Sequence, residues 1–188
     1  VEKENLKKED VDSLNRGLVN LERHILNIKK FGLEPIVAIN QFALDTKKEI
    51  DAVLNFCRHM SVQVSECKHW SMGGKGTIDL AKKVVKTCKN SKKSNFKLLY
   101  KDNLNLWDKI EKIVKEIYIG NRITANDDVK EQLKIFENNG YKNLPVCIAK
   151  TQYSFSTNPK LKGAPSNHEI QIREVRLSSG AGFIVVVC

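Results

Sequence analysis

The chain has 188 residues, 41% of them hydrophobic and 29% charged, which is the composition of a folded globular protein and excludes a disordered chain. No apolar run approaches the roughly 20 residues of a membrane-spanning helix, and the charged start VEKENLKKED is unlike a signal peptide. The five cysteines are scattered and never in CxxC spacing, which argues against a disulfide framework or a zinc site. We therefore expect no membrane partner and a cytoplasmic protein, or an organellar one if a transit peptide is missing.

The net charge of +10 is compatible with a polyanionic partner such as a nucleotide, a polycarboxylate or nucleic acid. Solvated surface lysines would give the same count. The sequence contains no nucleic-acid-binding motif, and its basic patches are not interleaved with aromatic residues as in a stacking platform. We expect small-molecule partners and no nucleic acid.

Alternating helices and strands are predicted in the first part of the chain. Residues 1–15 are polar and read as a frayed start, and an apolar stripe then predicts a helix over 17–31. PIVAIN (35–40) reads as a buried strand, and Thr46 and Glu49 have the spacing of a capping box that starts the next helix. Val62 and Val64 mark a second strand. A Gly-rich loop follows, and a helix is expected from about Thr77.

This order predicts an α/β fold with a wound, mostly parallel sheet and flanking helices. The basic stretch KNSKKSN (89–95) reads as a boundary, so we divide the chain into an α/β core at 1–92 and a smaller α+β region at 93–188.

The second region is predicted to contain two helices, three strands and one long loop. The helices are centred near Ile110 and Leu133, with Asn105 or Asp102 as the cap of the first. A strand at 144–149 precedes a polar loop at 150–168. In EIQIREVRL the apolar alternation changes phase, which predicts a bulge near Arg173. The last strand, FIVVVC, is still running where the chain stops, so we expect a fragment of a larger multi-domain fold.

Two aromatic residues follow the two strands of the first region. Asn40, Phe42 and Asp45 come directly after the first strand, and Trp70 follows the second. In open α/β sheets, ligands bind beyond the carboxyl ends of the strands. Two rings there could hold a flat ligand between them. The alternatives are that Phe42 packs in the core and that Asp45 caps the next helix.

Several other positions could meet an anion. Gly73, Gly74, Lys75 and Gly76 precede a helix and offer backbone N–H groups and an ammonium, although HWSMGGKGT is not a Walker A loop. Lys150, after a strand, could reach a phosphate or carboxylate, or could be an ordinary surface lysine. The turn that contains Ser178, Gly180 and Gly182 permits close backbone approach to a ligand, or is a plain tight turn.

Seven blocks in this order resemble the C-terminal half of the formate–tetrahydrofolate ligase family. They are GLVNLERHILNIKKFG, VAINQFALDT, HWSMGGKGTIDLA, KIEKIVKEIY, GYKNLPVCIAKTQYS, PKLKGAP and REVRLSSGAGF. The resemblance runs from about residue 16 to the end. It departs from the commoner Arg-Phe-Pro-Thr-Asp pattern at Gln41 and Ala43, which affects the shape of that loop and any anion contact, but not the ring contact at Phe42.

The resemblance implies an enzyme that makes formyl phosphate from formate and ATP and transfers the formyl group to tetrahydrofolate. It also implies Mg2+ with ATP, activation by a monovalent cation, and a homo-oligomer for the full-length enzyme. Phe42 and Trp70 match the pair that sandwiches the folate ring, and residues 178–182 match a segment near the nucleotide. The phosphate-binding loop of the P-loop-type core and the catalytic arginine would lie upstream of Val1. The catalytic residues are thus unknown here.

Two functions stay open at this stage. The first is the folate-binding portion of a formate–tetrahydrofolate ligase, which we expect to be inactive alone. The second is a non-catalytic module that binds folate or assembles with another subunit. The coding sequence upstream of Val1 distinguishes them, because a phosphate-binding loop there indicates the enzyme. We expect no bound metal ligated by this chain, since its four histidines have no metal-like spacing.

Overall fold

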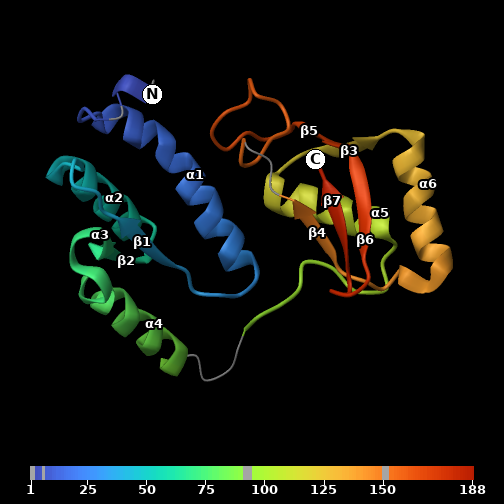
Figure 1. Ribbon diagram of the computed structural model, residues 1–188, viewed down its shortest axis with the longest axis horizontal. Helices are drawn as coiled ribbons and strands as arrows, with labels where there is room; N and C mark the ends of the chain where they lie inside the picture. Colours follow the sequence, from blue (N-terminus) through green and yellow to red (C-terminus); the bar gives the residue numbers. More distant parts are fainter. Residues whose placement is uncertain (1–2, 6, 91–94, 150–152) are drawn as a thin grey trace. The chain divides into compact units, whose positions relative to one another are not determined.

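Helices and short, mostly parallel sheets make up the fold, which confirms the predicted α/β class (Figure 1). The computed structural model describes residues 3–5, 7–90, 95–149 and 153–188. The chain divides into two units, Val1–Lys97 and Leu98–Cys188. Each unit is considered by itself below.

The first unit is built around two parallel strands. Its elements in chain order are η1 (Lys3–Asn5), α1 (Val11–Lys30), β1 (Ile36–Asn40), α2 (Lys47–His59), β2 (Gln63–Cys67), α3 (His69–Met72), η2 (Gly73–Thr77) and α4 (Ile78–Asn90). Strands β1 and β2 pair in parallel, with Ile36 opposite Gln63 and Asn40 opposite Cys67. Both strands therefore end at the same edge of the sheet. Helix α1 packs against α2, and α4 packs against both strands.

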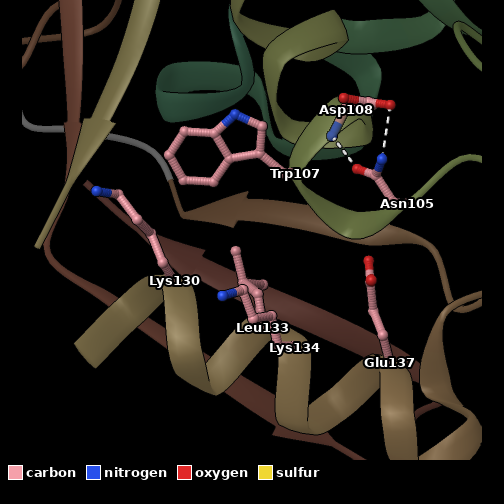
Figure 2. A pocket seen from close by; sticks show the side chains of 7 residues that line it. All are labelled: Asn105, Trp107, Asp108, Lys130, Leu133, Lys134 and Glu137. Carbon is pink, nitrogen blue, oxygen red and sulfur yellow. Dashed lines mark hydrogen bonds between the residues drawn. The ribbon is translucent and has the colours of Figure 1, made fainter. Parts of the chain in front are cut away.

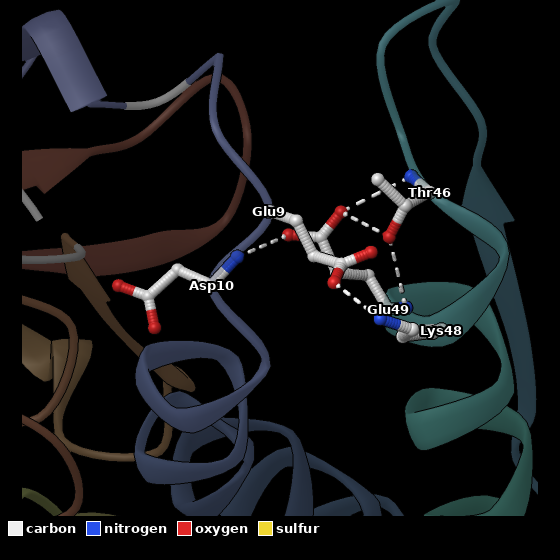
Figure 3. Close-up of polar contacts among 5 residues, drawn as sticks. All are labelled: Glu9, Asp10, Thr46, Lys48 and Glu49. Atoms are coloured by element: carbon white, nitrogen blue, oxygen red, sulfur yellow. Dashed lines mark hydrogen bonds and ion pairs between the residues drawn. The ribbon is translucent and has the colours of Figure 1, made fainter.

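Helix α1 begins earlier than the sequence predicted. The expected frayed start at 1–15 is wrong from Val11 onward, because Asp10 caps the helix and its carboxylate accepts a hydrogen bond from Ser13 N–H at 2.8 Å. The Asp10 N–H in turn donates to Glu49 Oε1 at 3.1 Å (Figure 3). A long-range bond thus holds a helix end whose own sequence is polar.

Helix α2 begins with the capping box that the sequence predicted. Thr46 is the N-cap, Glu49 N–H donates to Thr46 Oγ1 at 3.3 Å, and Thr46 N–H donates to Glu49 Oε2 at 3.1 Å. An ion pair between Lys48 and Glu9 at 3.0 Å lies beside it (Figure 3). The remaining predicted elements of this unit, β1, β2 and α4, are confirmed within a residue or two.

The second unit has its own apolar core and two small sheets. Its elements are α5 (Leu106–Ile113), η3 (Val114–Tyr118), β3 (Arg122–Ala125), α6 (Asp127–Phe136), η4 (Glu137–Tyr141), β4 (Val146–Ala149), β5 (Glu169–Ile172), β6 (Glu174–Ser178) and β7 (Phe183–Val187). Strand β3 pairs with β5 in parallel, and β7 lies between β4, which is parallel to it, and β6, which is antiparallel. Fully buried Leu106, Ile110, Ile170, Ile184 and Val186 lie at the centre of the core.

Two features of this unit differ from the sequence prediction. Strand β3 was missed, because four residues between a turn and a helix are too few to show an alternating pattern. The predicted bulge near Arg173 and Glu174 is wrong, because β5 and β6 belong to different sheets. Arg173 is the single residue between them, and its N–H donates to Val187 O at 2.9 Å. The phase change therefore marks a change of partner strand and not an irregularity within one strand.

Candidate functional site

The carboxyl ends of β1 and β2 lie side by side in the first unit. Asn40 is opposite Cys67, and the Gln41 N–H donates to Cys67 O at 3.0 Å, which extends the pairing one residue further. The segments that follow these strands therefore leave the sheet next to each other. This is the edge at which open α/β sheets bind ligands.

Phe42 and Trp70 meet at this edge. Their ring centroids are 5.9 Å apart and their planes are inclined by 41°. Both side chains are largely exposed, Phe42 by 52% and Trp70 by 72%, so the alternative that Phe42 packs in the core is wrong. Large aromatic side chains usually lie inside a fold. An exposed pair in mutual contact is a surface on which a flat apolar group can stack.

Asp45 fixes the backbone that carries Phe42. Its Oδ2 accepts a hydrogen bond from the Phe42 N–H at 2.7 Å, and its own N–H donates to Phe42 O at 3.2 Å. The alternative that Asp45 caps helix α2 is wrong, since Thr46 is the cap. Asp45 thus closes a tight turn that holds Phe42 at the end of β1.

Trp70 lies in a short helical segment and not in an irregular loop. Residues 69–72 form α3 and residues 73–77 form η2, where the sequence suggested an open Gly-rich loop. His69 lies beside Trp70, with ring centroids 6.4 Å apart. The segment closes on itself through a hydrogen bond from Lys68 N–H to Gly76 O at 3.0 Å.

A polar contact attaches the start of α4 to the strand beneath it. Asp79 accepts hydrogen bonds from Lys83 Nζ at 2.5 Å and from Ser65 Oγ at 2.6 Å. The hydrogen bond from Lys83, and to a smaller extent that from Ser65, holds the pKa of Asp79 below its usual value. Ser65 is buried within β2, and Lys83 also donates to Val64 O at 2.6 Å. The helix that follows the Trp70 segment is therefore fixed to the sheet.

Most residues proposed for anion contact in this unit are exposed, whereas Gly76 is half-buried. Gly73, Gly74 and Lys75 lie on the surface of η2, and Asn40 is exposed at the end of β1. Gly73 has φ +55°, a conformation that favours glycine. Whether these groups hold an anion stays a prediction.

Three features of this edge were not predicted from the sequence. Leu44 and Met72 are both exposed and extend the apolar character of the two segments that carry the aromatic pair. Leu44 lies two residues after Phe42, and Met72 lies two residues after Trp70. The sequence signal that could have identified them is an apolar residue in a segment that directly follows a strand. Gln41 also has a buried side-chain oxygen, Oε1, without a hydrogen-bond partner in the part of the chain that the structure describes.

The other predicted positions belong to the second unit. Ser178, Gly180 and Gly182 form the hairpin turn between β6 and β7, in which Ser178 O accepts from the Gly182 N–H at 2.9 Å. A Cβ atom at Gly180 or Gly182 would meet nothing within 4 Å, but Gly182 has φ +71°, a backbone conformation that favours glycine. The geometry is that of a tight turn, and a ligand contact there stays a prediction. Lys150 lies outside the described residues.

A groove of about 300 Å³ lies between α5 and α6 in the second unit (Figure 2). Trp107 and Leu133 face each other across it, with Lys130 beside them. Its carboxylates form hydrogen bonds at the start of α5. Glu137 Oε1 accepts from the Leu106 N–H at 2.6 Å, and Asp108 Oδ2 accepts from Asn105 Nδ2 at 2.7 Å. Asn105 is the N-cap, as predicted. The carboxylates of this groove are thus occupied at the start of α5, and its lysines, Lys130 and Lys134, form ion pairs with Asp127 and Glu131.

Neither a metal cluster nor a membrane span is found among the described residues. No three His, Cys, Asp or Glu side chains gather there as a metal site requires. Within the same residues, no helix is both long and apolar enough to cross a bilayer.

The fold and the edge together define an α/β protein with an aromatic pair at adjacent strand ends. Comparison with known proteins makes this specific. The family model described as formate–tetrahydrofolate ligase matches residues 1–188, and the chain belongs to this family.

Curated relatives carry the same description. The chain is 51% identical over 188 residues to the formate–tetrahydrofolate ligase of Pelagibacter ubique, 48% over 188 residues to that of Ruegeria pomeroyi, and 49% over 187 residues to that of Sinorhizobium medicae. Each match covers 100% of this chain and 33%, 34% and 33% of the relative, respectively. The chain therefore spans about a third of the length of the curated relatives it matches.

Proposed function

We propose that this chain is the tetrahydrofolate-binding portion of a formate–tetrahydrofolate ligase. The whole enzyme would join formate to tetrahydrofolate with hydrolysis of ATP, giving 10-formyltetrahydrofolate, ADP and phosphate. Family membership over residues 1–188 supports the reaction class. The observation that carries the role of this portion is the exposed pair of Phe42 and Trp70, 5.9 Å apart at the ends of two neighbouring strands.

The geometry of the pair suggests how the folate ring system would bind. Carbon atoms in contact lie about 3.5–4.0 Å apart, so a flat ring between two others needs about 7–8 Å between the outer planes. Phe42 and Trp70 are closer than this and inclined by 41°. Both are surface side chains, and a change of side-chain rotamer in each would open the slot. The ligand would then replace the contact between the two rings with two stacked contacts.

ATP, Mg2+ and the monovalent cation belong to this proposal through the family resemblance. Phosphoryl transfer depends on cations and N–H donors placed around the transferred phosphate. The described residues hold no cluster that fits a metal ion. We assign this chain the binding and orientation of the folate, which the exposed aromatic pair supports.

Replacement of Trp70 tests the proposed role of the aromatic pair. Trp70→Ala should weaken tetrahydrofolate binding by about 1–3 kcal/mol, through lost burial and lost ring contact, which is about 5- to 150-fold in Kd. The measurement is equilibrium binding of tetrahydrofolate, with far-ultraviolet circular dichroism to check that the variant keeps its fold. Trp107→Phe, at the tryptophan of the other unit, is the matched control and should bind as the unaltered chain does.

Two results would contradict this role. Unchanged tetrahydrofolate binding in Trp70→Ala would remove the aromatic pair from the site. A loss of tetrahydrofolate binding together with a loss of far-ultraviolet circular dichroism would instead show that Trp70 supports the fold.

An activity assay tests whether this chain catalyses the whole reaction or supplies the folate site alone. The 188-residue chain alone should show no measurable formation of 10-formyltetrahydrofolate from formate, ATP and tetrahydrofolate, because it supplies one side of the reaction only. The absorbance of the acid-treated product is a direct readout, with a complete ligase as the positive control. Turnover by the isolated chain at the rate of that control would overturn the assignment.

A further inference from the structure

Trp70 lies in a closed segment of nine residues whose two ends touch. The chain leaves β2 at Cys67, passes through α3 and η2, and returns so that Lys68 N–H donates to Gly76 O at 3.0 Å. Trp70 and the exposed Gly73, Gly74 and Lys75 lie on this excursion. The point of closure therefore sets where the indole lies relative to the sheet.

Gly76 is at this point of closure, and there is no space for a side chain. A Cβ atom built on it would lie 2.5 Å from the carbonyl carbon and oxygen of Lys68 and 2.8 Å from the backbone nitrogen of His69. All three are backbone atoms, which cannot rotate away as the end of a side chain can. Its φ lies outside the left-handed region, so lack of space and not backbone conformation requires glycine here.

The neighbouring glycines have different surroundings. A Cβ at Gly74 would meet nothing within 4 Å, and its φ also lies outside the left-handed region. Gly73 is equally open but has φ +55°. Gly74 is therefore a matched control for Gly76, with the same residue type, helical turn and exposed segment, but without the close backbone approach.

The downstream side of the closure is fixed. Three residues after Gly76, Asp79 accepts a hydrogen bond at 2.6 Å from Ser65, whose side chain is buried within β2. An added atom at residue 76 would thus push against a helix start that is tied to the sheet. Upstream, the sheet holds the chain as far as Cys67, whose carbonyl accepts from the Gln41 N–H, so the displacement would fall on Lys68 and His69, directly before Trp70.

We propose that Gly76 is a positioning residue, whose close approach to the Lys68 backbone holds Trp70 beside Phe42. Its consequence for the ligand rests on the proposed tetrahydrofolate site. In Gly76→Ala the Lys68–Gly76 hydrogen bond is broken and the indole moves away from the phenyl ring. Loss of one aromatic contact should reduce tetrahydrofolate affinity roughly 2- to 10-fold.

The test compares Gly76→Ala with Gly74→Ala in a Trp107→Phe background, where Trp70 is the sole tryptophan. We expect Gly76→Ala to change the Trp70 emission and near-ultraviolet circular dichroism and to weaken tetrahydrofolate binding. Gly74→Ala should change neither. Far-ultraviolet circular dichroism checks that both variants keep their helices, since a purely structural defect would lower that signal as well.

A second variant covers the case in which Gly76→Ala does not fold. Ser65→Ala adds no atom but removes one of the two hydrogen bonds that hold Asp79, the other being that of Lys83, and it should change the Trp70 spectra in the same direction. The proposal is overturned if folded Gly76→Ala matches Gly74→Ala, or if Gly76→Ala unfolds and Ser65→Ala leaves the Trp70 spectra unchanged.

A Trp70→Ala arm separates the two hypotheses. If that variant binds tetrahydrofolate normally, the proposed ligand site fails, whereas the spectra of Gly76→Ala still decide whether residue 76 positions the indole. If Trp70→Ala loses binding and folded Gly76→Ala does not, the ligand site stands and the positioning role fails.

Discussion

Lys109 is a charged side chain with 0% exposure in the core of the second unit. Its Nζ donates to Lys142 O at 2.7 Å and to Leu144 O at 3.0 Å, and lies 5.9 Å from the centre of the Tyr100 ring. Burial lowers the pKa of this lysine from its ordinary value. Two backbone carbonyls of the turn before β4 thus depend on one ammonium group.

Lys109→Met keeps most of the side-chain volume and removes these bonds. The carbonyls of Lys142 and Leu144 then lose a charged donor, so we expect a loss of about 2–4 kcal/mol in the free energy of unfolding. Lys112→Met is the control, because Lys112 is exposed and forms an i,i+4 ion pair with Glu116 at 3.0 Å, worth about 0.5 kcal/mol or less. Urea unfolding measures both. Equal midpoints would show that the buried ammonium contributes no net stability.

At the scale of elements, Glu49 joins the starts of two helices. Its carboxylate accepts hydrogen bonds from the N–H groups of Asp10, which caps α1, and Thr46, which caps α2 (Figure 3). The backbone bond from Asp10, followed by that from Thr46, lowers the pKa of Glu49 below its ordinary 4.5. The stabilisation by this carboxylate is therefore fully present above pH 4.5 and is lost as the pH falls through the lowered value.

Glu49→Gln removes this titration and keeps the amide oxygen as an acceptor. We expect the variant to be less stable at neutral pH but to lose less stability than the unaltered chain as the pH falls below 4.5. Thermal unfolding between pH 3 and 7 measures the difference. Asp51→Asn, exposed on the same helix, should retain the acid dependence of the unaltered chain. Parallel pH curves for Glu49→Gln and the unaltered chain would contradict the role of Glu49.

Local signals predicted most elements, and one of the misses, the start of α1, depends on a contact that is distant in sequence. The capping box of Thr46 and the cap at Asn105 act within four residues, so the sequence contains all the information needed. The start of α1 depends on a bond between Asp10 and Glu49, 39 residues apart. Nothing in the sequence marks Lys109 as buried, since lysine on a helix is usually exposed.

The candidate site was also predictable only in part. The positions of Phe42 and Trp70 after two strands were predictable, because parallel strands end at one edge. Their contact was not, since it depends on the turn closed by Asp45 and on the closure at Gly76. Both are local geometries that residue types alone do not define.

At the scale of the molecule, the chain consists of two units, and the described apolar cluster of the second contains residues of that unit. We expect Lys109→Met to increase amide hydrogen exchange within residues 98–188 and to leave residues 7–90 nearly unchanged, because stability differs between cooperative units. Mass spectrometry of peptides from each unit measures this. A matching increase in both units would show that the two unfold as one.

The single residue between β5 and β6 has a further consequence for insertions and deletions. Arg173 separates two strands whose apolar residues, Ile172 before it and Val175 after it, are both buried. Side chains alternate between the two sides of a strand. Removing one residue here would therefore exchange the buried and exposed faces of strand β6. The length of the chain at this junction is thus constrained, because a chain shortened by one residue here would place Val175 on the exposed side of its strand.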